Sequence, residues 1–373
     1  MTSRSVGAAW RAYDLQLTTY AALLGSIGLV MAYTNSVEAG QSVLAGGTVF
    51  SRALMWSALA MVVFTVVSLF DYHWLKTLAW PIYGVSVGLL VVTLAIGDGV
   101  GGSARWVSLG PFTFQFSELS KILMMVVLAA YLGNREGRLD SLSSIAGACM
   151  LMVPPVLLVM LQPDLGTSLV LVSILAGMLF MSGASLRWLL AMAAGLLAAI
   201  PLAWTYVLHD YQKNRILSFL DPSADAQGSG YQLIQSQIAV RSGGLLGTGL
   251  TNGSQGRGEF LPVQESDFVF AVLAQELGFI GALVVFVLFA ALIWRILACA
   301  WRSRDPFGTL LGTGLASMIL FQVFVNIGMV IGILPITGIP LPFITHGGAS
   351  LLSIAIGLGI LQSVNVRQRR AEW

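Results

Sequence analysis

The chain has 373 residues, of which 57% are hydrophobic and 10% are charged, and its formal net charge is +2. Soluble globular domains carry about 25% charged residues, so this composition excludes an ordinary soluble protein and indicates a polytopic membrane protein. The sequence contains no P-loop motif and no basic–aromatic repeat, which argues against an ATP-driven machine and against a nucleic-acid-binding protein.

Ten mostly apolar stretches are candidates for membrane-spanning helices, each of which needs about 20 residues to cross the hydrocarbon core. The fourth and sixth stretches are short, and the eighth is long enough to tilt or to extend beyond the membrane. In chain order the predicted spans are 15–34, 52–70, 75–96, 118–132, 142–161, 166–181, 187–208, 267–298, 309–333 and 346–362. We therefore predict an all-α membrane protein in which residues 1–373 form a single integral membrane domain.

Arginine residues are concentrated in loops on one side of the predicted spans. An even number of spans places both termini on the same side, and the short loops at 134–140 and 301–305 and the tail at 367–370 are rich in arginine. Short cytoplasmic loops carry the excess of basic residues in membrane proteins. Both termini are therefore predicted to be cytoplasmic, and the long polar loop at about 209–266 is predicted to be extracytoplasmic.

Polar clusters at 103–106, 115–121, 162–166 and 210–215 fall on the same predicted outer side as this loop. They are separate in sequence but share one membrane face. We therefore expect the apolar helices to bring them together around a single outward-facing cavity.

Several residues in these clusters have both a functional and a purely structural explanation. Glu118 and Lys121 are three residues apart and can pair on one helical face, or they can act as a helix-start carboxylate and a snorkelling lysine. Arg105 beside Trp106 suits either a phosphate group or the membrane interface. The turn from Gln162 to Asp164 offers a carboxylate that can simply cap the sixth span.

Asp267 stands where the long polar loop meets the eighth predicted span. An aspartate at a helix start is favoured by the free backbone N–H groups, so capping explains its position. However, Glu265 lies two residues earlier, and its negative charge favours protonation of one of the two carboxyl groups. A carboxylate that accepts a proton near neutral pH is suited to general-base catalysis.

Deeper in the same span, Glu276 lies nine residues beyond Asp267, or roughly 14 Å along a helix. An ionisable group at that depth is costly and is a candidate functional group facing the bundle interior, although a protonated structural glutamate fits as well. Gln322 and Asn326, spaced four residues apart, are expected to hold helices together rather than to touch a substrate.

Taken in order, the polar segments resemble the SEDS (shape, elongation, division and sporulation) family of bacterial cell-wall synthesis proteins. The stretch at 332–342 and the glutamine-rich start of the loop resemble the elongation branch, RodA, more than the division branch, FtsW. The segments that carry the resemblance are ARWVSLG (104–110), QFSELSK (115–121), QPDLGT (162–167), RILSFLDP (215–222), GYQLIQS (230–236), GGLLGTG (243–249), FLP (260–262), SDF (266–268), ELG (276–278), GILPITGIPLP (332–342) and GG (347–348).

The resemblance implies a ten-span glycosyltransferase of the bacterial inner membrane that polymerises lipid II into peptidoglycan strands. It also implies a partner, a class B penicillin-binding protein with transpeptidase activity. Asp267 matches the aspartate regarded as catalytic in the family, and we interpret it as the general base for the attacking sugar hydroxyl. The predicted substrate-binding residues are Arg105, Trp106, Glu118, Lys121, Gln162, Asp164, Arg215, Arg257, Glu265 and Glu276.

Among these, Arg105, Lys121, Arg215 and Arg257 are the candidate ligands of the pyrophosphate, because guanidinium groups bind phosphate bidentately and lysine acts as a point charge. Conversion of an α-linked donor into a β-linked product implies inversion by one direct displacement, with no covalent enzyme intermediate.

The chain departs from the family pattern at a few positions. Phe116 stands where the family often has proline, and the stretch at 345–350 differs from the usual Ser-Tyr-Gly-Gly-Ser-Ser. Glu265 and Ser266 replace a frequent His-Thr pair, which places a carboxylate beside the predicted base. Either Glu265 tunes Asp267, or the two carboxylates bind a divalent cation such as Mg²⁺ or Mn²⁺.

Alternative functions are a flippase or transporter of a lipid-linked precursor, a division-type FtsW member of the family, and a non-catalytic scaffold for the penicillin-binding protein. A transporter favours polar groups near the midplane and internal repeats. The sequence has no convincing repeat, and its charged groups cluster on the outer side. The enzyme interpretation is therefore preferred.

Overall fold

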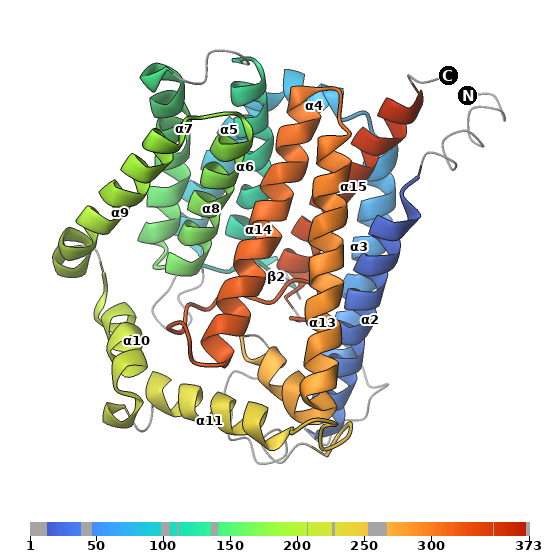
Figure 1. The fold of residues 1–373 in the computed structure, drawn as a ribbon, viewed down its shortest axis with the longest axis vertical. Coiled ribbons are helices and arrows are strands. Elements are labelled where there is room, and N and C mark those ends of the chain that lie inside the picture. The colour runs from blue at the N-terminus through green and yellow to red at the C-terminus, as the bar shows by residue number, and fades with distance from the viewer. Residues whose placement is uncertain are drawn as a thin grey trace.

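Helices formed by the apolar stretches run between two opposite ends of the molecule, as Figure 1 shows. The structure is a computed structural model that describes residues 13–38, 47–97, 105–109, 112–135, 141–206, 208–225, 228–252, 267–345 and 347–370. The long helices are α2 (Leu15–Glu38), α3 (Val49–Leu69), α5 (Ala79–Ile96), α6 (Phe116–Gly133), α7 (Leu142–Leu161), α8 (Leu165–Met181), α9 (Leu186–Tyr206), α13 (Val269–Trp301), α14 (Pro306–Val330) and α15 (Gly348–Arg370). The shorter helices are α4 (His73–Thr77), α10 (Asp210–Leu220), the 3₁₀ helix η2 (Pro222–Ala224) and α11 (Ser229–Ser242).

Each predicted span overlaps one of the long helices, which confirms the prediction of a polytopic membrane protein of the α-helical class. Within the described ranges, nine helices are long and apolar enough to cross a bilayer. The remaining apolar helix, α8, has 17 residues, and the count of ten spans therefore stays a prediction. Much of α6, α8, α14 and α15 is buried, whereas α9 is covered little by the rest of the protein.

A short β-hairpin before α6 was not expected from the sequence. Strands β1 (Val107–Leu109) and β2 (Phe112–Phe114) pair antiparallel, with Val107 opposite Phe114. Strands of three residues are too short to produce a periodic hydropathy signal, and the neighbouring apolar spans dominate the pattern. The hairpin positions Arg105 before β1 and Gln115 after β2.

The long eighth span is interrupted by a break at Gly278, where φ is 67° and ψ is −169° inside α13. A glycine-rich segment that follows α11 docks into this break. Thr248 N–H donates to the Gln275 carbonyl (3.0 Å), and Phe279 N–H donates to the Gly244 carbonyl (2.9 Å). These bonds satisfy backbone groups that the break releases from the helix.

Glycine is needed on both sides of this contact. A Cβ added to Gly247 would lie 2.1 Å from the Glu276 carbonyl oxygen, and one added to Gly278 would lie 2.3 Å from the Gly247 nitrogen. Both residues also have positive φ angles. The GGLLGTG and ELG segments therefore form one packed unit.

At the end of the molecule opposite α10 and α11, α2 is attached to α13 by an ion pair. Arg295 Nη2 lies 2.6 Å from Asp14 Oδ2, and Asp14 Oδ1 also accepts the Leu17 N–H at the start of α2 (3.1 Å). Burial of Asp14 opposes its ionisation, but the hydrogen bonds from Arg295 and from the Leu17 N–H outweigh burial and hold the pKa of Asp14 below its usual value. This contact fixes the first described helix against α13.

Asp14→Asn is expected to lower the stability of the protein. Asparagine is a good helix N-cap, so this variant removes the charge and keeps the capping group. We expect a loss of about 2 kcal/mol, below the roughly 3–5 kcal/mol of a fully buried pair because the Arg295 side chain is 17% exposed. The measurement is the thermal unfolding midpoint in detergent.

The double variant Asp14→Asn/Arg295→Met is the control, and it should recover most of the loss because no unpaired charge remains. Since the pKa of Asp14 is lowered in the folded state, the contribution is present above the usual aspartate pKa of about 3.9 and is lost as the pH falls through the folded value. An Asp14→Asn protein as stable as the wild type at neutral pH would contradict this account.

Candidate active site

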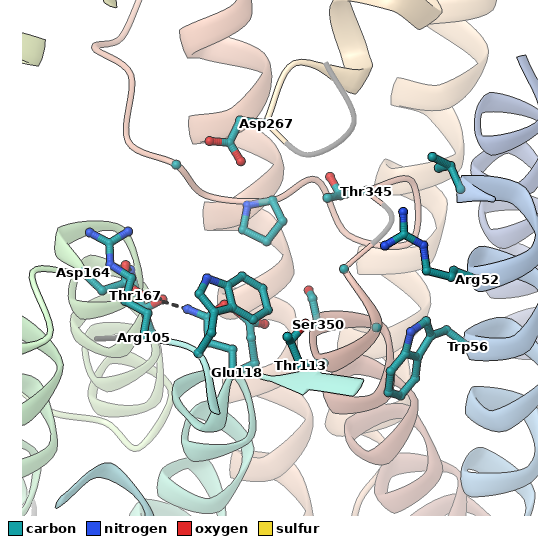
Figure 2. A pocket seen from close by; sticks show the side chains of 18 of the residues that line it. Arg52, Trp56, Arg105, Thr113, Glu118, Asp164, Thr167, Asp267, Thr345 and Ser350 are labelled. Carbon is teal, nitrogen blue, oxygen red and sulfur yellow. Dashed lines mark hydrogen bonds between the residues drawn. The ribbon is translucent and has the colours of Figure 1, made fainter. Parts of the chain in front are cut away.

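A cavity of about 780 Å³ lies in the half of the molecule that contains the hairpin and the loop after α14. Its walls come from the start of α3, the hairpin, α6, α8, α10, Asp267 shortly before α13, and the segment from Gly338 to the start of α15 (Figure 2). The lining residues with polar or aromatic side chains are Ser51, Arg52, Trp56, Arg105, Trp106, Thr113, Gln115, Glu118, Asp164, Thr167, Arg215, Asp267, Thr345 and Ser350.

Predicted site residues from distant parts of the sequence meet in this cavity. Arg105, Trp106, Glu118, Asp164, Arg215 and Asp267 all line it. The expectation that the outer polar clusters would gather around one cavity is therefore met for these residues. Their individual roles in binding or catalysis remain predictions.

Asp267 lies directly before Phe268, which occupies the N-cap position of α13. The capping explanation for Asp267 is thereby weakened, and Figure 2 shows its carboxylate pointing into the cavity. A Cβ added to Gly338 would lie 3.6 Å from Asp267 Oδ2 and 3.4 Å from Arg215 Nη1. Gly338, which has a φ of +73°, therefore lies close to both a carboxylate and a guanidinium of the cavity.

Glu118 and Lys121 form the predicted pair in the wall of the cavity. Lys121 Nζ lies 2.7 Å from Glu118 Oε2, and the two side chains are 1% and 4% exposed respectively. The lysine therefore does not snorkel to the interface. Glu118 lines the cavity, and Lys121 lies behind it as its counter-ion.

Asp164 caps α8, as the structural explanation predicted, and also faces the cavity. Its Oδ1 accepts the Thr167 N–H (3.1 Å), and its Oδ2 accepts bonds from Thr167 Oγ1 (2.9 Å) and Gln115 Nε2 (3.0 Å). The Gln115 contact joins the end of the hairpin to the start of α8. Both functions proposed for Asp164, capping and lining the site, are compatible in this arrangement.

Arg105 is held by the turn that precedes α8. Its Nε donates to the Gln162 carbonyl (3.1 Å), and its Nη2 donates to the Pro163 carbonyl and to the Tyr211 hydroxyl, the latter at 2.8 Å. Tyr211 also donates its hydroxyl to the Pro163 carbonyl, and Arg215 lies over the Tyr211 ring with Cζ 5.7 Å from the centroid. Tyr211, on α10, thus contacts both Arg105 and Arg215, two cationic residues of the cavity.

Sequence reasoning missed Tyr211, Arg52 and Trp56. Tyr211 lies inside the 210–215 cluster, but an aromatic residue near the interface is unremarkable by itself. Arg52 and Trp56 begin an apolar span, and Figure 2 shows them across the cavity from Asp164. Trp56 packs against Gly348, where an added Cβ would lie 2.2 Å from Trp56 Cε2. The Gly-Gly pair at 347–348 was therefore the sequence feature that could have indicated a large side chain packed at this position.

Other predicted residues lie away from the cavity or outside the described ranges. Gln162 is fully buried and donates from Nε2 to the Leu90 carbonyl (2.9 Å). Glu276 is buried at the α13 break, where its Oε1 accepts the Thr251 N–H (2.8 Å). Arg257 and Glu265 lie outside the described residues. Within the described ranges, no group of three His, Cys, Asp or Glu side chains is placed to hold a metal ion.

Comparison with known proteins identifies close relatives over most of the chain. A family model for the FtsW/RodA/SpoVE proteins, described as cell cycle protein, matches residues 14–370. The peptidoglycan glycosyltransferase MrdB of Escherichia coli (strain K12) is 43% identical over 289 residues, which are 77% of this chain and 78% of MrdB. The stage V sporulation protein E of Bacillus subtilis (strain 168) is 35% identical over 356 residues, covering 94% and 96% of the two chains.

Solved structures show the same fold. A chain from a peptidoglycan synthase complex that coordinates polymerization and crosslinking superposes with a TM-score of 0.81 at 31% identity, covering 95% of this chain and 98% of that chain. The rod shape determining protein RodA of Thermus thermophilus superposes with a TM-score of 0.70 at 30% identity, covering 95% and 97%. The chain therefore belongs to the FtsW/RodA/SpoVE family of cell cycle proteins, the SEDS family that its motifs resemble.

Proposed function

We propose that this protein is a peptidoglycan glycosyltransferase that polymerises lipid II into glycan strands during cell elongation and shape maintenance. The observation that carries the proposal is the placement of Asp267 and Arg215 close to Gly338 in one cavity of a membrane domain. The 43% identity to a relative named peptidoglycan glycosyltransferase supports the reaction class.

In the proposed reaction, Asp267 accepts the proton of a GlcNAc 4-hydroxyl as that oxygen attacks the anomeric carbon of a lipid-linked MurNAc. The bond between the anomeric carbon and the pyrophosphate oxygen breaks, and the polyprenyl pyrophosphate leaves with both electrons. One displacement of this kind inverts an α-linked donor into a β-linked product. The base contributes typically 10²–10⁴-fold to the rate of such a proton transfer.

Arg215 and Arg105 are the described residues best suited to hold the departing pyrophosphate. Guanidinium groups can bind phosphate oxygens with two parallel N–H donors, a geometry proposed here for Arg215. Arg105 uses its Nε and Nη2 donors on Gln162, Pro163 and Tyr211, so its Nη1 group is the one proposed to contact phosphate. Arg105 is already oriented by the carbonyls of the 162–163 turn and by Tyr211. Orientation before the substrate arrives lowers the cost of ordering the side chain when phosphate binds.

The other predicted residues fall into two groups. Trp106, Glu118 and Asp164 line the cavity and are proposed to contact the sugars or the peptide of the substrate. Lys121 and Gln162 act through Glu118 and Arg105 respectively, whereas Glu276 supports the glycine-rich segment at the α13 break. Arg257 and Glu265 keep their predicted roles as pyrophosphate ligand and neighbour of the base.

We further propose that the protein works in the bacterial inner membrane with both termini in the cytoplasm and the cavity on the extracytoplasmic side. The arginine-rich short loops support this orientation. A class B penicillin-binding protein is the proposed partner, because a solved relative belongs to a synthase complex in which polymerization and crosslinking are coordinated.

Asp267→Asn is expected to reduce polymerisation of labelled lipid II by at least 100-fold, because the amide cannot accept the hydroxyl proton. Turnover is measured with purified wild-type and variant protein, with and without the penicillin-binding protein. Asp210→Asn is the matched control, since its side chain on α10 is 99% exposed. Full activity of Asp267→Asn would exclude Asp267 as the base, and wild-type protein that only moves lipid II across a membrane would favour the flippase.

The same assay, repeated with a chelator, tests whether the reaction requires the predicted divalent cation. If Asp267 and Glu265 bind Mg²⁺ or Mn²⁺, chelation abolishes turnover and the added ion restores it. If Glu265 only tunes the base, chelation leaves turnover unchanged.

Arg215→Lys is expected to lower kcat/KM for lipid II about tenfold. Lysine keeps the charge but loses the bidentate geometry, and a hydrogen bond to a charged group contributes roughly 1.5–3 kcal/mol. Arg241→Lys, at the end of α11 and outside the cavity, is the control and should retain wild-type kinetics. Equal kinetics for both variants would remove Arg215 from the pyrophosphate site.

A further inference from the structure

Asn326, on α14, contacts two segments of the active site at once. Its side chain is fully buried, and its Nδ2 donates to the carbonyl of Asp267 (3.0 Å) and to the carbonyl of Ile339 (2.8 Å). Because both partners are carbonyl oxygens, the NH₂ group must face them, so the orientation of the carboxamide is determined by its acceptors.

Both acceptors belong to the irregular segments around the cavity rather than to helix interiors. Asp267 carries the proposed base. Ile339 stands between Gly338 and Pro340, which both line the cavity. The sequence favoured a role for Asn326 in holding helices together, but the bonds it makes join the backbone of Asp267 to the segment after α14.

The Ile339 segment is in turn packed against the start of α8. A Cβ added to Gly166 would lie 2.8 Å from Ile339 Cγ1 and 2.9 Å from the Thr337 carbonyl oxygen. A displacement of Ile339 would therefore be transmitted to the α8 start, where Asp164 lies. Asn326 thus links the base, the loop after α14 and the opposite wall of the cavity.

We infer that Asn326 is a positioning residue that sets the distance between the Asp267 carboxylate and the Gly338 segment. This inference rests on the proposed function for its catalytic consequence, but the geometric claim stands apart from it. Both N–H donors are used, and within the described ranges the buried Oδ1 has no hydrogen-bond partner. The carboxamide is therefore committed to these two carbonyls.

The kinetic test compares Asn326→Leu and the size-matched Asn326→Asp with the wild type. Both remove the pair of N–H donors, and we expect kcat for lipid II polymerisation to fall on the order of 100-fold, since a displacement of about 1 Å can cost that much. KM should change by less than about twofold. Gln322→Leu is the matched control, because Gln322 is an equally buried carboxamide one turn earlier on α14.

A second measurement does not depend on activity. In a protein that carries Asp267→Cys and Gly338→Cys, the rate of disulfide formation between the two positions reports their distance. Adding Asn326→Leu should slow this rate about tenfold, and adding Gln322→Leu should leave it unchanged.

The outcomes separate the inference from the proposed function. Unchanged kcat and an unchanged disulfide rate in the Asn326 variants would overturn the inference. An equal loss in Gln322→Leu would also overturn it, because the effect would then be general to α14. A slowed disulfide rate in a protein whose wild type does not polymerise lipid II would support the positioning role and reject the proposed function.

Discussion

Backbone N–H and C=O groups inside a bilayer must find partners within the protein, since no water is present to replace them. Non-helical backbone at membrane depth is tolerated only where it is buried in protein or lines a water-filled cavity. In the described part of this chain, the hairpin, the turn before α8 and the segment after α14 gather around one cavity. The break in α13 and the glycine-rich segment that pairs with it form a second irregular region away from this cavity. Irregular backbone therefore occurs where other parts of the protein satisfy its polar groups, and the cavity is one such place.

Several of the charged side chains that line the cavity have partners within the protein. Glu118 is neutralised by Lys121, and Asp164 is occupied by the α8 cap and by Gln115. Arg105 is restrained by carbonyl groups. Asp267, which lies close to Gly338 and Arg215, is the third described carboxylate in the lining of the cavity.

The sequence predicted what depends on composition and order, and missed what depends on local geometry. Hydropathy located each long helix, because an apolar run of about 20 residues has few alternatives to spanning a bilayer. It did not reveal the break at Gly278, since one glycine hardly changes the mean hydropathy of a 33-residue helix. Asn326 was interpreted as a contact between helices, because i,i+4 spacing indicates a shared face but not the acceptors opposite that face.

Glu276 is a second residue whose hydrogen-bond partner could not be predicted from the sequence. The sequence left a functional and a structural interpretation open for this residue, and in the structure its Oε1 accepts the Thr251 N–H of a segment that hydropathy treats as loop. Pairing of this kind depends on how the glycine-rich segment folds back onto α13. Sequence patterns give the cost of burying a carboxylate and do not give the identity of the group that offsets it.

The break at Gly278 also explains why the proposed base needs support from outside its own helix. The part of α13 beyond the break is attached to α2 through Arg295 and Asp14, whereas the part before it begins next to Asp267 and contacts the glycine-rich segment. The residue with a φ of 67° interrupts the helix axis, so the two parts of α13 have separate sets of contacts. The position of Asp267 therefore depends on lateral contacts, and the bond from Asn326 supplies one of them from α14, a helix whose interior residues are largely buried.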